Sequence, residues 1–511
     1  MRPLYARTVL LALLLTTRSL MATETPFAIR VVDEKTGRGV PLVELETVHQ
    51  QVFVTDSAGR VAVTAPELQH QRVYFHVRSH GYEYPADGFG YRGVRLDVRP
   101  GEEATVTIPR RNIAERLYRV TGAGLYADTV AVGEAAPIRK PLLNAQVMGA
   151  DSVVTAEYRD QLYWFWGDTH RIGYPLGNFH VSGATSSLPA AGGWDPARGV
   201  DLEYFVDSQG FAKQMARMPG EGPTWIWGLV VVEDDQGERL FTGFEKVQGL
   251  QVYQRGIAEF DNQREEFVLK KLVDKHVPLY LHGHPFRHQV DGVTYFYFGD
   301  PYPVMRVPAT AEAVLDLARY EGFTCLVPGS RKQESPRVER CEEGRVVWGW
   351  KRDTAAICWS LQQQLLKQGQ LAADEVWLQL VDAELGDTVV AHRGSVTWND
   401  YRDCWVLITT QQGGSSFLGE VWYAESVAPE GPWCEATKVV THEDYSFYNP
   451  KQHPYFAAEG GRFLFFEGTY TRTFSGNPQA TPRYDYNQVM YRLDLADPRL
   501  SGGQREPVSA N

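Results

Sequence analysis

Three stretches of this chain repeat one pattern: a polar head, a short strand, a turn and a strongly aromatic strand. They are MGADSVVTAEYRDQLYWFWGDT (148–169), HGHPFRHQVDGVTYFYFGDP (282–301) and KQHPYFAAEGGRFLFFEGTY (451–470). The segments 223–246 and 392–414 fit the same pattern more loosely. Five approximate repeats of an antiparallel unit are typical of a β-propeller. The uneven spacing of the repeats leaves a sandwich or a barrel open as alternatives.

The other patterns divide the chain into parts. Short strands alternate with glycine-containing turns near the N-terminus, which predicts a small β-sandwich. Helical periodicity in ATAEAVLDLARY and TAAICWSLQQQLLKQGQLA predicts a partly helical insertion. We therefore expect an all-β protein with a small N-terminal β-sandwich, followed by a five-bladed β-propeller with a partly helical insertion. The expected bounds are 26–112 for the sandwich, 113–143 for a connector, 144–500 for the propeller, about 309–385 for the insertion and 501–511 for a disordered tail.

The first residues and the net charge bear on location and partners. Arg2 and Arg7 precede the apolar run VLLALLL, which is the plan of a secretory signal peptide over residues 1–22. We therefore expect a secreted or periplasmic protein. The net charge is −12 and the basic residues are scattered, so we expect no nucleic-acid partner. No later apolar stretch predicts a membrane span, and the oligomeric state is left open.

Asp151 and Asp168 form the most informative pair of charged residues. If Arg159-Asp160 is a two-residue turn, antiparallel pairing places Asp151 directly opposite Asp168. Like charges at such positions destabilise a strand pair. Glycoside hydrolysis requires such a pair, because one carboxyl group protonates the leaving oxygen while the other attacks the anomeric carbon or activates a water. Two other readings stay open: Asp168 could satisfy backbone N–H groups in a tight turn, and Arg159-Asp160 lacks the Asn or Gly that fixes such a register.

The polar heads of the later repeats are expected to meet this pair in one central funnel. Glu467 would join them, facing Pro454 if Gly460-Gly461 is the turn. The two-carboxylate chemistry requires no cofactor. The alternation in HGHPFRH places its histidines on one strand face, however, which is compatible with a divalent metal such as Ca²⁺, Mn²⁺ or Zn²⁺. The candidate ligands are His282, His284 and His453; histidines of this kind equally often serve as hydrogen-bonding groups.

Short motifs resemble two known families. The pieces DEKTGRGVP and VTDSAGRVAV resemble the carboxypeptidase regulatory-like (transthyretin-like) domain, which implies an accessory sandwich. The pattern GAD…LYWFWGDTH resembles the five-bladed propeller family that includes bacterial endo-D-arabinanases, and more loosely glycoside hydrolase family 43. This resemblance implies that Asp151 and Asp168 are the acid, base or nucleophile. Where family 43 places carboxylates at later heads, this chain has Thr224 and His284.

The sequence thus predicts a secreted glycoside hydrolase whose substrate is an extracellular polysaccharide or oligosaccharide. One alternative is a polysaccharide lyase that uses histidine and arginine, with or without a metal. Another is a non-catalytic carbohydrate-binding surface protein. The predicted catalytic residues are Asp151, Asp168 and Glu467. The predicted substrate-binding residues are His170, Asn178, His284, Arg393, His453 and Tyr484.

Overall fold

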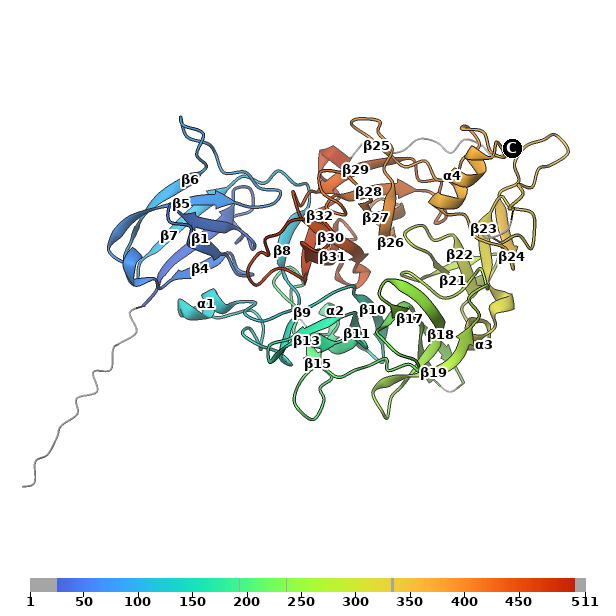
Figure 1. The fold of residues 1–511 in the computed structure, drawn as a ribbon, viewed down its shortest axis with the longest axis horizontal. Coiled ribbons are helices and arrows are strands. Elements are labelled where there is room, and N and C mark those ends of the chain that lie inside the picture. The colour runs from blue at the N-terminus through green and yellow to red at the C-terminus, as the bar shows by residue number, and fades with distance from the viewer. Residues whose placement is uncertain (1–24, 193, 236, 332–334, 501–511) are drawn as a thin grey trace, which may run out of the picture.

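The structure is a computed structural model that describes residues 25–192, 194–235, 237–331 and 335–500. The expected signal peptide (1–22) and the expected tail (501–511) lie outside the described residues. The described part is built mostly of strands, with a few short helices (Figure 1). None of its helices has both the length and the apolar character that crossing a membrane requires.

Two sheets pack face to face in the N-terminal part of the chain (Figure 1, blue). One has the strand order β4-β1-β7 and the other β3-β2-β5-β6. Alternate residues point into one shared apolar core, as in β5, where Val73, Phe75 and Val77 are buried. The strands are β1 (Phe27–Asp33), β2 (Glu44–Thr47), β3 (Val52–Val54), β4 (Arg60–Val63), β5 (Gln71–Arg78), β6 (Gly93–Val98) and β7 (Glu103–Ile108), with the short helix η1 (Pro66–Leu68).

Five further sheets follow in chain order after residue 150. The first is β10 (Val154–Tyr158), β11 (Gln161–Trp166), β14 (Ser182–Ser187) and β15 (Glu203–Tyr204). The second is β16 (Thr224–Asp234), β17 (Gly237–Gln248), β18 (Gln251–Asp261) and β19 (Glu266–Val273). The third is β20 (Phe286–Val290), β21 (Val293–Phe298), β22 (Met305–Pro308), β23 (Glu321–Thr324) and β24 (Gly349–Arg352).

The fourth and fifth sheets complete the series. The fourth is β26 (Ala391–Asn399), β27 (Cys404–Gln411), β28 (Val421–Ser426), β29 (Glu435–Val440) and β25 (Val381–Asp382). The fifth is β30 (Ser446–Gln452), β31 (Phe463–Thr471), β32 (Asn487–Asp494) and β8 (Glu115–Arg119). The strand β8 comes from before the first sheet, so both ends of this region of the chain meet in one sheet.

The five sheets pack against one another in a cycle (Figure 1). Each of five apolar clusters joins one sheet to the next. The last of these clusters joins the fifth sheet back to the first, through Phe465 and Met490 on one side and Trp164 and Trp166 on the other. The first sheet, whose strand β10 begins three residues after Asp151, is therefore packed against a neighbouring sheet on each side.

Residues 309–385, predicted as a partly helical insertion, contain both helices and strands. The helical parts are α3 (Ala311–Leu315), η2 (Leu317–Arg319) and α4 (Trp359–Lys367). In α4, Leu361 and Leu365 lie four residues apart on one face and are fully buried. The strands β23 and β24 belong to the third sheet, so this segment is partly a continuation of that sheet and only partly an addition to it.

The remaining elements are short and connect the sheets. They are α1 (Ala127–Ala131), β9 (Val147–Ala150), β12 (Thr169–Arg171), β13 (Tyr174–Asn178), α2 (Pro189–Gly192), η3 (Pro454–Phe456) and η4 (Pro498–Leu500). The three strands β13, β12 and β9 form a small sheet of their own beside the first sheet.

Two predicted registers have opposite outcomes. The hairpin of β10 and β11 has the predicted register, with Tyr158 opposite Gln161. Its turn is formed by Arg159 and Asp160, which both adopt positive φ (51° and 58°). The register expected around Glu467 was wrong, because Glu467 pairs with Lys451. The cause is a register shift in β30 together with a turn of 3₁₀ helix that begins at Pro454, where the prediction assumed a continuous strand.

Candidate active site

Asp151 and Asp168 are brought together at the open end of the first hairpin. The Asp151 N–H donates to the Asp168 carbonyl (3.3 Å), and the Gly167 N–H donates to the Asp151 carbonyl (2.7 Å). The chain bends between them at Ser152, which has φ 52°. Gly167 is required here, since a Cβ at that position would lie 2.2 Å from Asp151 Oδ1. The predicted opposition of the two carboxylates is therefore present, and both side chains stay partly exposed.

Two tyrosines from the fifth sheet hold the Asp151 carboxylate. The Tyr448 hydroxyl donates to Asp151 Oδ2 (2.7 Å). Tyr486 also hydrogen-bonds this carboxylate, as does the backbone N–H of Asp168. Tyr448 lies in β30 and Tyr486 directly precedes β32, so the fifth sheet positions the carboxylate of the first. Donors of this kind favour the ionised form of an acid.

The two carboxyl groups sit in different environments, which separates their roles. Burial and then the negative charge of Asp151 raise the pKa of the Asp168 carboxyl to about 7, although a hydrogen bond from Trp225 opposes the rise. Burial also raises the pKa of Asp151, but the donors around it work against this rise. Asp168 Oδ1 is buried and has no protein partner. Both carboxyl groups therefore titrate above their usual pKa, and because the hydrogen-bond donors gather on Asp151, Asp168 is the better position for a proton that the pair shares.

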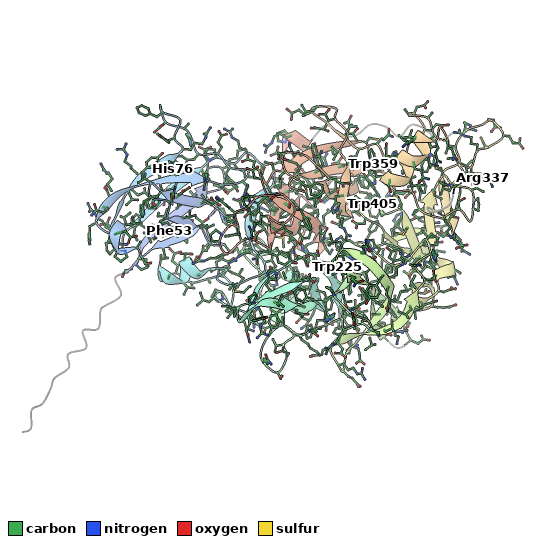
Figure 2. All side chains as sticks on the ribbon, in the orientation of Figure 1. Phe53, His76, Trp225, Arg337, Trp359 and Trp405 are labelled. Carbon is green, nitrogen blue, oxygen red and sulfur yellow. The ribbon has the colours of Figure 1, made fainter. Side chains whose placement is uncertain are left out.

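His170 lies beside Tyr486, one of the two tyrosines on Asp151. Its ring stacks on Tyr486, with centroids 4.5 Å apart and an interplanar angle of 13°. Burial lowers its pKa, so the ring is neutral near pH 7. The ring therefore offers an uncharged hydrogen-bonding edge close to the Asp151 carboxylate. Trp225, on β16, lies near the middle of the view of the five sheets (Figure 2).

A second polar group is formed by residues of the third and fourth sheets. Arg393 Nε lies 3.2 Å from Asp300 Oδ2, and His282 Nε2 lies 3.5 Å from the same oxygen. The guanidinium of Arg393 also lies over the Trp227 ring, 4.3 Å from its centroid. Burial alone would raise the pKa of Asp300, but the charges of Arg393 and His282 outweigh it and leave the pKa below its usual value. Arg393 Nη1, His282 Nδ1 and the Nδ1 of His392 are buried without a protein partner.

A third polar group surrounds Glu467. His453 Nε2 lies 3.0 Å from Glu467 Oε1, and both side chains are completely shielded from solvent. Burial raises the pKa of Glu467 to about 8, with the neighbouring Lys451 working against the rise. Burial lowers the pKa of Lys451 to about 8 as well. Burial and then the Lys451 charge hold the pKa of His284 well below its usual value, which places His284 at the edge of this group.

Four of the predicted residues have positions that a substrate does not reach: His453, described above, and Asn178, Tyr484 and Glu467. Asn178 is buried, and its amide donates to the carbonyls of Val181, Ala212 and Lys213. Tyr484 is 1 % exposed, and its hydroxyl donates to the Thr55 carbonyl. Glu467, predicted as a third acid in the funnel, is fully buried behind the strand. Each of these residues has the polar character of a site residue, and only its contacts reveal the structural role.

Metal ligation was the other role expected of the histidines. Within the part of the chain that the structure describes, no three His, Cys, Asp or Glu side chains converge as metal ligands. The candidate ligands are instead divided, with His282 on Asp300 and His453 on Glu467.

The sequence interpretation missed Asp300 and Lys451. Asp300 occupies the same Gly-Asp position after an aromatic strand as Asp168, and this repeat was available as a signal. Lys451 stands at a polar head two residues before the predicted His453, but nothing in the sequence indicates that it is buried.

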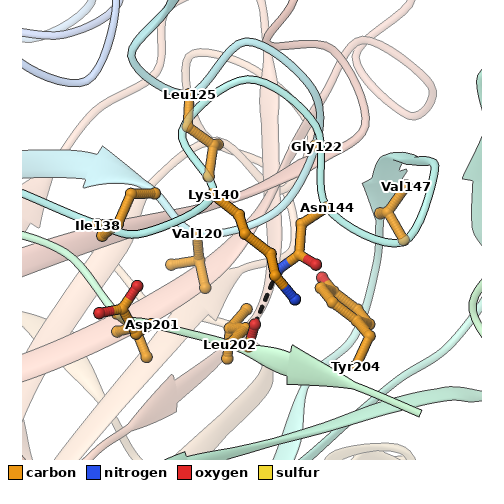
Figure 3. A pocket seen from close by; sticks show the side chains of 11 residues that line it. Val120, Gly122, Leu125, Ile138, Lys140, Asn144, Val147, Asp201, Leu202 and Tyr204 are labelled. Carbon is orange, nitrogen blue, oxygen red and sulfur yellow. Dashed lines mark hydrogen bonds between the residues drawn. The ribbon is translucent and has the colours of Figure 1, made fainter. Parts of the chain in front are cut away.

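A small cavity beside β15, the last strand of the first sheet, is not a substrate site. It has a volume of about 20 Å³ and lies between Ile138, Asn144, Leu202 and Tyr204 (Figure 3). The Asn144 amide donates across its wall to the Leu202 carbonyl (2.8 Å). A volume of this size admits about one water molecule and no sugar ring.

Comparisons with known proteins yield distant likenesses. No family model matches the chain, and no curated protein matches it. Among solved structures, an exo-1,5-α-L-arabinanase from a bovine ruminal metagenomic library is 9 % identical, covers 68 % of this chain and 94 % of its own, and has a TM-score of 0.34. A putative exo-β-1,3-galactanase from Bifidobacterium bifidum s17 is 11 % identical, covers 78 % and 99 %, and has a TM-score of 0.37.

A thermostable family-43 glycoside hydrolase is 11 % identical, with coverage of 68 % and 90 % and a TM-score of 0.33. Scores at this level describe what the chain is similar to and carry no argument about what it does.

Proposed function

We propose that this protein is a glycoside hydrolase that cleaves a polysaccharide or oligosaccharide with the pair Asp151 and Asp168. The observation that carries the proposal is the unequal environment of two neighbouring carboxyl groups. Asp168 has a pKa of about 7, while two tyrosine hydroxyls and a backbone N–H favour the anion of Asp151. A pair of this kind, one protonated and one ionised, is what glycoside hydrolysis requires.

In this mechanism Asp168 is the general acid. Its proton passes to the glycosidic oxygen as the bond from that oxygen to the anomeric carbon breaks. Asp151 either attacks the anomeric carbon or removes a proton from the attacking water, and its charge stabilises the positive carbon in the transition state.

The surrounding groups supply the binding surface in this proposal. His170 and Arg393 are partly exposed and present ring and guanidinium nitrogens. His284 stands between the second and third polar groups. His453 is too deeply buried to touch a sugar and instead positions Glu467. In the proposal, Trp225 on β16 and Arg393 on β26 contact neighbouring sugar units.

The proposal also includes the architecture of the protein and its location. We read the five sheets and their cyclic packing as the five blades of a propeller, with β8 completing the fifth blade. Residues 1–22 carry the plan of a signal peptide, so the proposed site of action is outside the cytoplasm and the substrate is an extracellular polysaccharide.

The test is hydrolysis of a polysaccharide panel by the wild type and by Asp151→Asn and Asp168→Asn. We expect each substitution to lower kcat by roughly 10²–10⁴-fold, since each removes a group that exchanges a proton or forms a bond. Circular dichroism and the melting temperature should stay close to those of the wild type. Asp160→Asn, at the exposed tip of the same hairpin, is the matched control and should keep full activity.

Three results would contradict the proposal. Full activity in Asp151→Asn would remove its central residue. An unsaturated, ultraviolet-absorbing product would indicate a lyase. Binding of the panel without any new reducing ends would indicate a carbohydrate-binding protein.

A further inference from the structure

A large open cavity lies away from the carboxylate pair, at the seam between the N-terminal sheets and the fifth sheet. Its volume is about 1030 Å³. One wall comes from the N-terminal part, from Leu42 and Glu44 to Arg111, and the other from residues 443–445 and 477–482. Ligand sites occur preferentially in concave seams of this size between domains.

The walls of this seam cavity carry groups suited to a polyol. Arg78 pairs with Glu44 (3.0 Å), and Glu83 pairs with Arg92 (2.5 Å) and Arg111 (2.8 Å). Such pairs leave free N–H donors and carboxylate lone pairs side by side, and this combination matches sugar hydroxyls.

Aromatic surface and near balance of charge favour an uncharged ligand. Tyr82 lines the seam cavity with a buried hydroxyl that has no protein partner. Tyr445 lines the opposite wall, and its hydroxyl is already used by Gln479 and Thr481. Both tyrosines are almost completely buried, and the Tyr445 ring stacks on Tyr470, so they add apolar contact at the cavity wall and no open stacking face. The cavity wall carries three arginines and four carboxylates, and this near balance of charge favours neither an anion nor a strongly basic peptide as the ligand. The charged residues of the wall are Arg78, Arg92, Arg111, Glu44, Glu83, Glu443 and Asp444.

One loop joins the seam cavity to the carboxylate pair. The segment 472–486, between β31 and β32, lines the cavity with residues 477–482. Earlier in the loop, Phe474 packs edge-on against Tyr448 at 5.1 Å. Its last residue is Tyr486, which hydrogen-bonds Asp151. The same segment therefore lines the cavity, contains Tyr486 and contacts Tyr448, and these are the two tyrosines that hydrogen-bond Asp151.

We propose that the seam cavity is a second, non-catalytic saccharide-binding site, which holds another segment of the polysaccharide that the carboxylate pair cleaves. The choice of a saccharide as the ligand rests on the proposed function. The inference assigns a role to the N-terminal sheets, which supply one wall of the site.

The experiment fills the cavity without touching the carboxylates. Ala480 is exposed and lines the cavity, so Ala480→Trp places a large ring in it. Ala457→Trp, at an exposed position outside the cavity lining, is the matched control. Both are made in the Asp168→Asn background, which leaves the polysaccharide uncleaved. Binding is read as retardation in native gels that contain arabinan, galactan, xylan, arabinogalactan or gelatin.

We expect at least one polysaccharide to retard Asp168→Asn, and Ala480→Trp to weaken that binding by about tenfold or more, with Ala457→Trp unchanged. Equal retardation of the two tryptophan variants would overturn the inference, as would the absence of retardation by every polysaccharide. Retardation by gelatin alone would assign the cavity to a peptide and overturn it as well. Hydrolysis by the wild type is scored separately, so a failure of the proposed function is distinguishable from a failure of this site.

Discussion

At the scale of single residues, the proton on Asp168 controls the proposed reaction. Its pKa of about 7 means that the general acid loses its proton as the pH rises through neutrality. Asp151 must be ionised, and the Tyr448 hydroxyl lowers its pKa. The profile of kcat/KM should therefore be a bell whose alkaline limb lies near pH 7 and whose acid limb belongs to Asp151.

Tyr448→Phe tests this assignment of the acid limb. Loss of the hydroxyl removes a donor from the Asp151 anion, so its pKa rises and the acid limb moves to higher pH. Below neutrality kcat/KM should fall on the order of tenfold, and the alkaline limb should keep its position. Tyr455→Phe is the control, since its hydroxyl bonds Thr155 and lies outside the pair. An unshifted acid limb in Tyr448→Phe would contradict the role given to Asp151.

Glu467 leads to a prediction about stability. Burial raises its pKa to about 8, so between about pH 4.5 and 8 the folded protein binds a proton that the unfolded chain has released. Its contribution is complete below the unfolded pKa and is lost as the pH rises through 8. Glu467→Gln should remove this dependence, so that the decrease in unfolding free energy between pH 5 and pH 8.5 is smaller by about 2–4 kcal/mol than in the wild type. Urea unfolding at pH 5 and pH 8.5 measures it, and an unchanged slope would refute the proton count.

The same residues show how far the sequence could go. The opposition of Asp151 and Asp168 follows from the spacing of one hairpin, so local sequence was sufficient to predict it. Tyr448 lies 297 residues away from Asp151, and no local pattern reports a contact across that distance. Tyr484 and Tyr486 are equivalent in sequence, but one is buried under the N-terminal sheets and the other faces the pair.

At the scale of elements, the turn of the first hairpin keeps a backbone conformation that its residues do not favour. Arg159 and Asp160 both have positive φ, as a type I′ turn requires, and such turns prefer Asn-Gly. Replacing the pair by Asn-Gly should raise the unfolding free energy by about 1 kcal/mol, measured by urea unfolding, with activity unchanged.

The hairpin of β20 and β21 offers a matched control for this turn. Asp291-Gly292 occupies the same kind of turn, with φ of 49° and 76°. Gly292→Ala should lower the unfolding free energy by about 1 kcal/mol, since no neighbouring atom lies near an added Cβ and only backbone strain changes. An unchanged stability in both variants would mean that these turns do not constrain the hairpins.

Strand registers were predictable only where a hairpin is regular. The first hairpin has no irregularity, and its register follows from the turn position. Around Glu467 the pairing is irregular, with a register shift between Tyr448 and Lys451 and a 3₁₀ turn that begins at Pro454. Strict alternation of strand residues therefore gives the wrong partner for Glu467. Likewise, α4 is shorter than its helical periodicity suggested, beginning at Trp359 and ending at Lys367.

At the scale of the whole molecule, Arg116 joins the N-terminal sheets to the fifth sheet. It lies in β8, is 1 % exposed, and donates to the carbonyls of Pro41 (3.0 Å), Leu42 (3.2 Å) and His80 (3.0 Å). All three acceptors belong to the N-terminal part. The Pro41 and His80 carbonyls would lose this donor if the guanidinium were removed, while the Leu42 carbonyl would keep the Ser79 hydroxyl (2.8 Å). A buried acceptor left unpaired costs free energy.

Arg116→Met should therefore lower the free energy of unfolding by about 2–4 kcal/mol and separate the unfolding of the two parts. Differential scanning calorimetry should resolve two transitions where the wild type has one. The exposed Arg95, on β6, provides the control, and Arg95→Met should leave the single transition in place. A single, unshifted transition in Arg116→Met would show that the two parts are not coupled through this residue.

The placement of β8 also constrains how the chain acquires its shape during synthesis. Glu115 on β8 meets Arg492, 377 residues further along, so β8 leaves the ribosome long before its partner β32 exists. In the meantime its edge is open to mispairing with other chains. The N-terminal sheets are complete by residue 108 and supply the acceptors for Arg116. We therefore expect the folded N-terminal sheets to hold β8 through the contacts of Arg116 until its partner strand β32 has been synthesised.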